Sequence, residues 1–225
     1  MVAMTPARWQ KTEEYINVVL GSVWPELDAV RERAHREGMP DIAVSQSVGQ
    51  ALKLLARASQ ASLAVEVGTL GGYSAAWIAR GLTRPNGRLI TIERIAAYAA
   101  FARRELATLG LGVRCDVLEG DALDVLGDLT KELDPESVDL LFLDADKAEY
   151  LAYWRTMEAW IKPGGMVVVD NALGTGSWWI DEEEHPERQG VHALTEALAH
   201  DPRYDTALFP LREGLLVARK REKEV

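Results

Sequence analysis

The stretch VEVGTLGGYS, residues 65–74, decides the fold class of this chain. It begins as a short apolar run, turns through glycines and then enters a segment with helical spacing of apolar residues. A strand that passes through glycines into a helix is typical of an α/β protein. Gly68, Gly71 and Gly72 permit tight turning and close approach of the backbone to a ligand. Their spacing is not the G-x-G-x-x-G of dinucleotide folds, and Glu66 beside them would repel a phosphate and attract a cation.

Similar short apolar runs follow along the chain, separated by segments of helical length. The core runs are rich in Val, Ile and Leu and cover residues 62–68, 87–93, 113–120, 138–144 and 164–170. Such alternation predicts a mostly parallel sheet with helices on both faces. After an irregular stretch we expect a helix over residues 190–201 and an antiparallel edge pair from residues 204–211 and 213–220. The expected fold is α/β, with a Rossmann-like, doubly wound, mostly parallel seven-stranded sheet.

The first sixty residues have a different pattern, with apolar side chains at three- and four-residue spacings that predict helices. These helical segments are residues 7–22, 25–38 and 48–59. The sequence has no internal repeat and no low-complexity linker. We therefore expect one domain over residues 1–225, with N-terminal helices in residues 1–60 and the α/β core in residues 61–225.

The composition limits the classes of function. The 225 residues include 35 acidic and 25 basic side chains, and the formal net charge of −10 opposes binding to the phosphate backbone of a nucleic acid. No apolar run approaches the ~18 residues of a membrane span, and the N-terminus has no continuous apolar signal region. We expect a cytoplasmic protein without a membrane partner. The single cysteine, Cys115, is expected to be a buried, unreactive thiol.

Every strand of the predicted core carries a carboxylate at or beside its carboxyl end, where doubly wound sheets bind their ligands. Glu93 ends the second strand, and a carboxylate there can accept hydrogen bonds from ribose hydroxyls. Together with Glu66 and the glycine turn, the pattern fits a ligand that has a nucleoside and a positive charge but no phosphate. S-adenosylmethionine meets that description.

Residues 66–74 resemble the E-[IV]-G-T-x-x-G-Y-S motif of the metal-dependent O-methyltransferases, which include catechol and caffeoyl-CoA O-methyltransferases. The likeness extends through residues 39–50, 143–150, 164–172 and 212–220. It implies S-adenosylmethionine as cofactor, held by Val44, Glu66, Gly68, Thr69, Ser74, Glu93, Asp121, Ala122 and Asp144. For Asp121, a helix N-cap is an equally good explanation.

Asp144 and Asp170 end two predicted strands that we expect to be neighbours. Neighbouring strands lie about 4.8 Å apart, so both carboxylates could bind one ion, and Asn171 would add a neutral oxygen. Oxygen ligands without Cys or His favour Mg²⁺ or a similar divalent cation, and the resemblance implies the same three ligands. The competing explanation is that these aspartates cap a helix or a turn. Asp146 has no ligand role by resemblance, and we expect it to be a cap.

Lys147 follows at the start of a helix, where a cation is disfavoured. A nearby dication disfavours its ammonium form further, so we expect Lys147 to lose its proton near neutral pH. The resemblance implies that Lys147 is the general base and, with Asp144, a catalytic residue. In the expected reaction the metal holds two acceptor oxygens and Lys147 takes the proton. The acceptor oxygen then attacks the sulfonium methyl in line.

The expected activity is O-methylation of a small catechol-like or phenolic acceptor. One alternative is a tRNA hydroxyl as acceptor, which the net charge opposes. A second, of a different class, is an NAD-dependent oxidoreductase, which the glycine spacing opposes. A third is a binding protein without turnover, which the intact set of candidate catalytic residues opposes.

Several features of the acceptor region and of the assembly stay open. Trp178 and Trp179 could stack on an aromatic acceptor or belong to the core or a dimer contact. The acidic run Asp181–Glu184 is most simply a solvated loop, and the alternative is that it contacts a cationic substrate or closes the site. Of the four histidines, only His192 is a candidate to face the acceptor. The N-terminal helices resemble those that form homodimers in bacterial members of the family.

Overall fold

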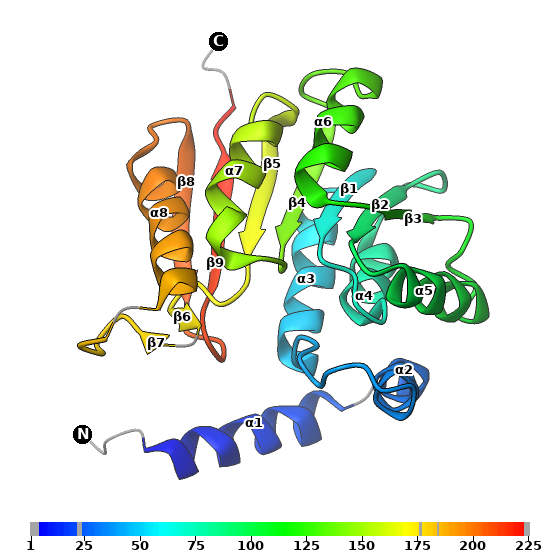
Figure 1. Ribbon diagram of the computed structural model, residues 1–225, viewed down its shortest axis with the longest axis vertical. Helices are drawn as coiled ribbons and strands as arrows, with labels where there is room; N and C mark the ends of the chain where they lie inside the picture. The colour runs from blue at the N-terminus through cyan, green and yellow to red at the C-terminus, as the bar shows by residue number, and fades with distance from the viewer. Residues whose placement is uncertain (1–4, 22–23, 176, 184, 223–225) are drawn as a thin grey trace.

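The computed structural model describes residues 5–21, 24–175, 177–183 and 185–222. Its centre is a seven-stranded sheet with the order β3-β2-β1-β4-β5-β9-β8, visible in Figure 1. The strands are β1 (Leu63–Val67), β2 (Arg88–Glu93), β3 (Cys115–Glu119), β4 (Val138–Leu143), β5 (Ile161–Val169), β8 (Tyr204–Phe209) and β9 (Leu215–Lys220). All seven coincide with the apolar runs in the sequence.

The strands from β1 to β5 run parallel, and the last two are antiparallel. β1 pairs with β2 on one side and β4 on the other, and the pairs β2–β3 and β4–β5 are also parallel. β9 lies antiparallel to both β5 and β8. Between β1 and β4 the strand order reverses, which is the point where doubly wound sheets bind ligands. The expected Rossmann-like sheet with an antiparallel edge pair is therefore confirmed.

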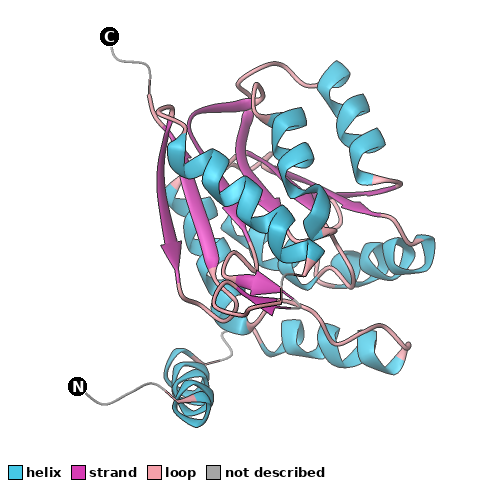
Figure 2. Cartoon of the chain, turned by 60° about the vertical axis from the view of Figure 1, so that its left-hand side comes forward, coloured by secondary structure: helices cyan, strands magenta, loops and turns pink. Residues whose placement is uncertain are grey.

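Helices cover both faces of the sheet (Figure 2). α3 (Gln46–Ala58), α4 (Tyr73–Gly81) and α5 (Ala96–Thr108) pack on one face with strand side chains such as Ala64 and Phe142. α6 (Ala122–Glu132), α7 (Tyr150–Met157) and α8 (Pro186–His200) pack on the other with Val65 and Leu141. Alternate residues of each strand enter different cores, which explains why the strands are continuous apolar runs.

The first helix, α1 (Pro6–Leu20), begins after the N-cap Thr5 and is followed by Gly21 with a φ of 61°. Figure 1 shows α1 apart from the sheet. Its exposed apolar side chains are Tyr15, Val18, Val19 and Leu20. Within the residues described, none of the helices has the length and apolar character needed to cross a membrane.

The second helix, α2 (Pro25–Arg36), is held against α5 by apolar and charged contacts. Val30 and Ala34 pack with Phe101 in a small buried cluster. Arg33 donates hydrogen bonds of 2.8 and 2.5 Å to one oxygen of the buried Glu105 carboxylate. This attachment holds α2 close to the carboxyl ends of the parallel strands.

The segment after β5 is more regular than we expected. It contains a short antiparallel pair, β6 (Gly174–Thr175) and β7 (Ser177–Trp178). α8 begins at Pro186 rather than at residue 190. Proline suits the first helical turn, and the His185 side chain accepts a hydrogen bond of 3.3 Å from the Glu187 N–H, so this sequence caps the helix earlier.

Cys115 is buried at the start of β3. Burial in this apolar setting raises the pKa of its thiol to about 12. A thiol that does not ionise near neutral pH is a poor nucleophile, so the expected unreactive cysteine is confirmed.

Candidate active site

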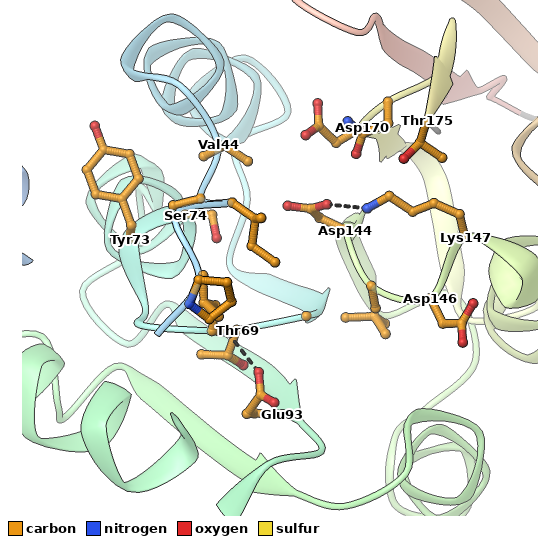
Figure 3. Close-up of a pocket in the computed structure, with 18 of the residues that line it drawn as sticks. Val44, Thr69, Tyr73, Ser74, Glu93, Asp144, Asp146, Lys147, Asp170 and Thr175 are labelled. Carbon is orange, nitrogen blue, oxygen red and sulfur yellow. Dashed lines mark hydrogen bonds and ion pairs between the residues drawn. The ribbon is translucent and has the colours of Figure 1, made fainter. Parts of the chain in front are cut away.

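A cavity of about 960 Å³ opens at the carboxyl ends of the parallel strands. Figure 3 shows its lining, which includes the β1–α4 turn, the end of β2 and the segments that follow β4 and β5. The residues predicted from the sequence line this cavity with one exception, Glu66. Those that line it are Val44, Gly68, Thr69, Ser74, Glu93, Asp121, Ala122, Asp144, Lys147, Asp170 and Asn171.

The turn after β1 needs glycine for a reason the sequence did not show. Gly68 has a φ of 99°, in the left-handed region. A Cβ there would overlap the main-chain carbonyl of Asp144, which directly follows β4. Gly68 therefore lets the ends of β1 and β4 approach each other, in addition to any room it leaves for a ligand.

Glu93 fixes this turn to the end of β2. Its two carboxylate oxygens accept hydrogen bonds from the main-chain N–H groups of Leu70 and Ile95, each at 2.8 Å. The side chain also lines the cavity, and each oxygen keeps a further lone pair. Its predicted role as acceptor for ribose hydroxyls is compatible with this geometry.

Glu66 is fully buried and lies behind the cavity wall. Its neighbours Val65 and Val67 enter the core on the opposite face of the sheet, so Glu66 faces α3 and α4. Thr91 donates a hydrogen bond of 2.5 Å to its carboxylate, and the hydroxyls of Thr91 and Thr69 are also 2.5 Å apart. Burial raises the pKa of Glu66 to about 8. The predicted contact of Glu66 with the cofactor would have to pass through a cavity-lining neighbour such as Thr69 or Ser74.

The position of Asp121 is compatible with both roles that the sequence left open, a helix N-cap and a cofactor contact. It is the N-cap of α6, where its side chain accepts a hydrogen bond of 3.0 Å from the Leu123 N–H. It also lines the cavity beside Ala122. The cap is confirmed, and the contact with adenine stays a prediction.

Asp144 and Asp170 follow the neighbouring strands β4 and β5, so the parallel pairing brings them to the same edge. Lys147 lies beside them in Figure 3, with its Nζ donating a hydrogen bond of 2.7 Å to Asp144 Oδ1. Burial, reinforced by the charge of Asp144, raises the pKa of Asp170 to about 7, while the charge of Lys147 acts in the opposite direction. Lys147 thus pairs directly with Asp144, and its charge also acts on Asp170.

The side chains at this edge suit a hard divalent cation. Within the described ranges, no three His, Cys, Asp or Glu side chains gather as a metal site. Asp144 and Asp170 supply two carboxylates that disfavour each other's charge, and Asn171 beside them adds an amide oxygen. A cation would relieve that repulsion, and carboxylate, amide and water oxygens are ligands that Mg²⁺ accepts. The metal set therefore fits the residues present and stays a prediction.

Lys147 is less exposed than a surface cation, with 13% of its side chain accessible. It opens a short 3-10 turn, η1 (Lys147–Glu149), whose N-cap Asp146 accepts a hydrogen bond of 3.1 Å from the Ala148 N–H. The expected cap at Asp146 is confirmed. Lys147 Nζ also lies 5.4 Å from the centre of the buried Tyr150 ring. These contacts aim the amine at the cavity end where the two aspartates lie.

The cover of the cavity comes partly from α2, which the sequence does not connect with the site. Arg31 and His35 from α2, together with Ile42 and Ala43 from the segment before α3, line the cavity. The sequence predicts Val44 in that segment as a cofactor residue, but it links the N-terminal helices only with dimer formation. No short motif in α2 marks this role, because the role depends on the packing of α2 against α5.

One side of the cavity is formed by loops, and we call it the acceptor side because the sequence predicts the acceptor there. Trp178, Asp181 and Glu187 line it from the β6–β7 hairpin and the start of α8, and Arg212 and Glu213 line it from the β8–β9 turn. Trp178 is 42% exposed, as suits a side chain at a cavity mouth. The other open candidates lie elsewhere: Trp179 and His192 are exposed and do not line the cavity, and Glu184 lies outside the described residues.

Comparisons with known proteins identify the family. A family model described as O-methyltransferase matches residues 22–221. A catechol O-methyltransferase of Niastella koreensis is 33% identical over 203 residues, covering 90% of this chain and 91% of the relative. A catechol O-methyltransferase of Mycobacterium tuberculosis is 40% identical over 160 residues, covering 71% of this chain and 70% of the relative.

A solved structure with the same fold contains a product of the cofactor. The O-methyltransferase from Bacillus cereus, in complex with SAH, superposes with a TM-score of 0.87 at 30% identity, covering 96% of this chain and 99% of that one. SAH is what S-adenosylmethionine becomes when it loses its methyl group. The cavity at the switch point, the matching family model and these relatives lead to one conclusion: the chain belongs to the O-methyltransferase family and is an S-adenosylmethionine-dependent enzyme.

Proposed function

We propose that this protein methylates a hydroxyl group of a small catechol-like or phenolic acceptor, using S-adenosylmethionine and a divalent cation such as Mg²⁺. One observation carries the proposal: Asp144, Asp170 and Lys147 meet at the end of the cofactor cavity, with Lys147 Nζ 2.7 Å from Asp144. Deprotonation of a hydroxyl requires a base, and its methylation requires a methyl donor close by; the two carboxylates can hold a cation between them.

Asp144, Asp170 and Asn171 would hold the cation, which when bound would stabilise an acceptor oxygen that has lost its proton. Lys147 in its neutral form would accept that proton at Nζ. The ammonium group that results would be stabilised by the Asp144 carboxylate, through the contact already present. The acceptor oxygen would form its new bond to the methyl carbon as the carbon–sulfur bond breaks, and SAH would leave.

The cover formed by α2 and the segment before α3 would keep water out of this reaction. Val44 is buried, and Ala43 and Ile42 extend from it along the cavity wall. Exclusion of water strengthens the electrostatic interactions of the reacting groups and protects the methyl donor. Arg33 and Glu105 would hold this cover in place through their ion pair.

The charge of the acceptor side favours a neutral or cationic acceptor. Asp181, Glu187 and Glu213 line it, and the guanidinium of Arg212, which also lines it, pairs with Glu213 at 3.3 Å. An acceptor with a carboxylate, or with the phosphates of a CoA thioester, would be repelled. The exposed ring of Trp178 offers a surface for stacking with a planar acceptor.

A methyl-transfer assay tests the proposed function. Purified protein is incubated with S-adenosylmethionine and catechol, a catechol with an aminoethyl group or a catechol with a carboxylate side chain, with Mg²⁺ or with EDTA. We expect SAH and a methoxy product with Mg²⁺, little product with EDTA, and the lowest kcat/KM for the carboxylate. Equal rates with EDTA would overturn the role of the cation, and product from none of the three would overturn the acceptor class.

Family membership excludes an NAD-dependent oxidoreductase. A tRNA acceptor remains the second candidate from the sequence, and the net charge of −10 opposes it. Strong tRNA binding with a steep salt dependence would favour it over a small acceptor.

We also propose a homodimer that forms through α1. Val18, Val19 and Leu20 are all more than half exposed on a helix that lies apart from the sheet, and a second copy could cover them. Light scattering after size exclusion should give twice the mass of the chain, and Val18→Glu should give the monomer. If the unchanged chain is a monomer, this proposal is wrong.

A cytoplasmic location stays a prediction, which cell fractionation tests.

A further inference from the structure

A buried chain of hydrogen bonds connects Glu66 to the cofactor end of the cavity. Its members come from different elements: Glu66 from β1, Thr91 from β2 and Thr69 from the turn after β1. The oxygen–oxygen distances from Glu66 to Thr91 and from Thr91 to Thr69 are both 2.5 Å. Glu66 and Thr91 are fully buried, and Thr69, with 2% exposure, is the member that lines the cavity. Thr69 therefore connects this chain of hydrogen bonds to the cavity, which Ser74, a second neighbour of the Glu66 carboxyl, also lines.

Within the part of the chain that the structure describes, Glu66 forms no ion pair. The charged groups with the largest effect on the pKa of its carboxyl are Asp144 and Glu93, and both are acidic. The thiol of Cys115 also lies near enough to be affected by its charge. Ser74 at the start of α4 favours the charged form, yet the second oxygen, Oε1, has no hydrogen-bond partner among the residues described.

This environment holds Glu66 in its neutral form when the cavity is empty of ligand. Burial of an ion without a partner is costly, and it raises the pKa of Glu66 to about 8. Near neutral pH the carboxyl therefore keeps its proton, unlike an exposed glutamate.

Ionised Glu66 fixes the direction of both hydrogen bonds, because a carboxylate only accepts and each threonine hydroxyl has a single proton to donate. Neutral Glu66 leaves two arrangements open: its carbonyl oxygen can accept from Thr91, or its own proton can be donated to Thr91, which can then donate to Thr69. In the second arrangement the hydroxyl proton of Thr69 is free for another acceptor. When Glu66 is ionised, Thr69 donates to Thr91 and Thr91 to Glu66, and Thr69 presents only oxygen lone pairs to the cavity.

We propose that Glu66 is a positioning residue that releases its proton to solvent when the cofactor binds, and that this release fixes Thr69 as a hydrogen-bond acceptor toward the cofactor. S-adenosylmethionine carries a sulfonium and an ammonium group, and positive charge near the chain favours ionised Glu66. One proton leaves the carboxyl group for each cofactor bound, and no covalent bond of the cofactor changes.

Proton release couples cofactor affinity to pH. Below a pH of about 8, the free protein must lose a proton to bind, so Kd falls as pH rises, by up to about tenfold per pH unit. Above that pH Glu66 is already ionised, and the affinity no longer changes through this group. The pH dependence follows from the cofactor alone, so it does not rest on the acceptor or the metal proposed above.

Calorimetry counts the protons directly. Binding of S-adenosylmethionine is measured at pH 7 in phosphate, HEPES and Tris, and the slope of observed enthalpy against buffer ionisation enthalpy gives the protons released. We expect Glu66→Gln to release fewer protons than the unchanged protein by roughly 0.5–1 per cofactor. Protons exchanged by the cofactor itself cancel in this difference. Glu119→Gln, at the exposed end of β3, should keep the unchanged slope. Equal slopes for Glu66→Gln and the unchanged protein would overturn the proposal.

A second variant keeps the proposal testable if Glu66→Gln does not fold. Thr91→Val removes the hydrogen bond that lowers the pKa of Glu66 but leaves the carboxyl in place. We expect the pH above which Kd levels off to rise in this variant, and the KM for cofactor to rise more than kcat falls. A merely structural loss would weaken binding equally at all pH values, and that result would refute the coupling.

Discussion

The cofactor side and the acceptor side of the cavity are built from different kinds of structure. On the cofactor side, Thr69 and Glu93 belong to a strand end and its turn, and each is held by hydrogen bonds to a neighbouring element. On the acceptor side, Trp178 and Glu213 belong to a short hairpin and a turn between edge strands, and both are partly exposed. In the proposed reaction the sheet would fix the methyl donor, whereas loops, which tolerate sequence change, would surround the acceptor. Cofactor identity is therefore readable from the family, and acceptor identity is not.

Asp170→Ala should give the largest difference between the effect on catalysis and the effect on cofactor binding. Loss of a carboxylate that is proposed to hold the cation should lower kcat by roughly a thousandfold, because several kcal/mol of charge stabilisation would be lost. Binding of S-adenosylmethionine, measured by calorimetry, should change little. Asp128→Asn, on the exposed face of α6, is the matched control and should keep full activity. A large loss of cofactor affinity would show that the two sides do not act separately.

Lys147→Ala should lower kcat by about a hundredfold through loss of the proposed general base, with a smaller change in KM for cofactor. The measurement is initial rate of SAH formation at saturating cofactor and acceptor. Lys147→Arg keeps the positive charge but cannot act as a base, so it should be as inactive as the alanine variant. Full activity of the arginine variant would remove Lys147 as the base.

Gly68→Ala should disturb both sides through one contact. The new Cβ would overlap the Asp144 carbonyl and occupy a left-handed backbone position, so we expect a loss of about 2–4 kcal/mol of unfolding free energy. Thermal unfolding measures it. Gly110→Ala is the control, because Gly110 has a φ of 72° but no atom near the position of a Cβ. An equal loss of unfolding free energy in both variants would show that backbone strain, and not the contact between the strand ends, causes the destabilisation.

Glu66 should make the cofactor-free protein less stable as pH rises. Its pKa is about 8 in the folded protein and near 4.5 when unfolded, so between these values the unfolded chain holds fewer protons. Stability from this group is therefore complete below pH 4.5 and is lost as pH rises through 8. We expect Glu66→Gln to remove this loss. Urea unfolding of both proteins at pH 6 and pH 8.5 should show a larger decrease for the unchanged protein; parallel decreases would count against the neutral carboxyl.

Glu187→Gln should have the smallest effect and act only on acceptor choice. Removing one of three carboxylates should raise kcat/KM for an acceptor with a carboxylate group about threefold relative to neutral catechol. Thr175 can still donate its hydrogen bond to the amide, so the loop should keep its shape. If the ratio of kcat/KM for the two acceptors does not change, the charge preference does not depend on Glu187.

The apolar runs predicted the sheet well because buried parallel strands must be apolar on both faces. Strand ends then located the cavity, so residues such as Asp144 and Asp170 could be placed from the sequence. The cover from α2 could not, because it depends on contacts such as Arg33 with Glu105, 72 residues apart in the chain. The β6–β7 hairpin was also missed, since two-residue strands leave no periodic pattern.

The sequence by itself determined the order of strands and helices, the glycine turn and the carboxylates at the strand ends, because these follow from local periodicity and residue chemistry. Tertiary structure alone decided what each carboxylate faces. Glu66 and Glu93 both stand near strand ends, yet Glu66 lies behind the wall with a pKa of about 8, whereas Glu93 lines the cavity and accepts two main-chain hydrogen bonds. The physical reason is packing: whether an acidic side chain meets water, a ligand or a helix depends on elements that are distant in sequence and close only in the fold.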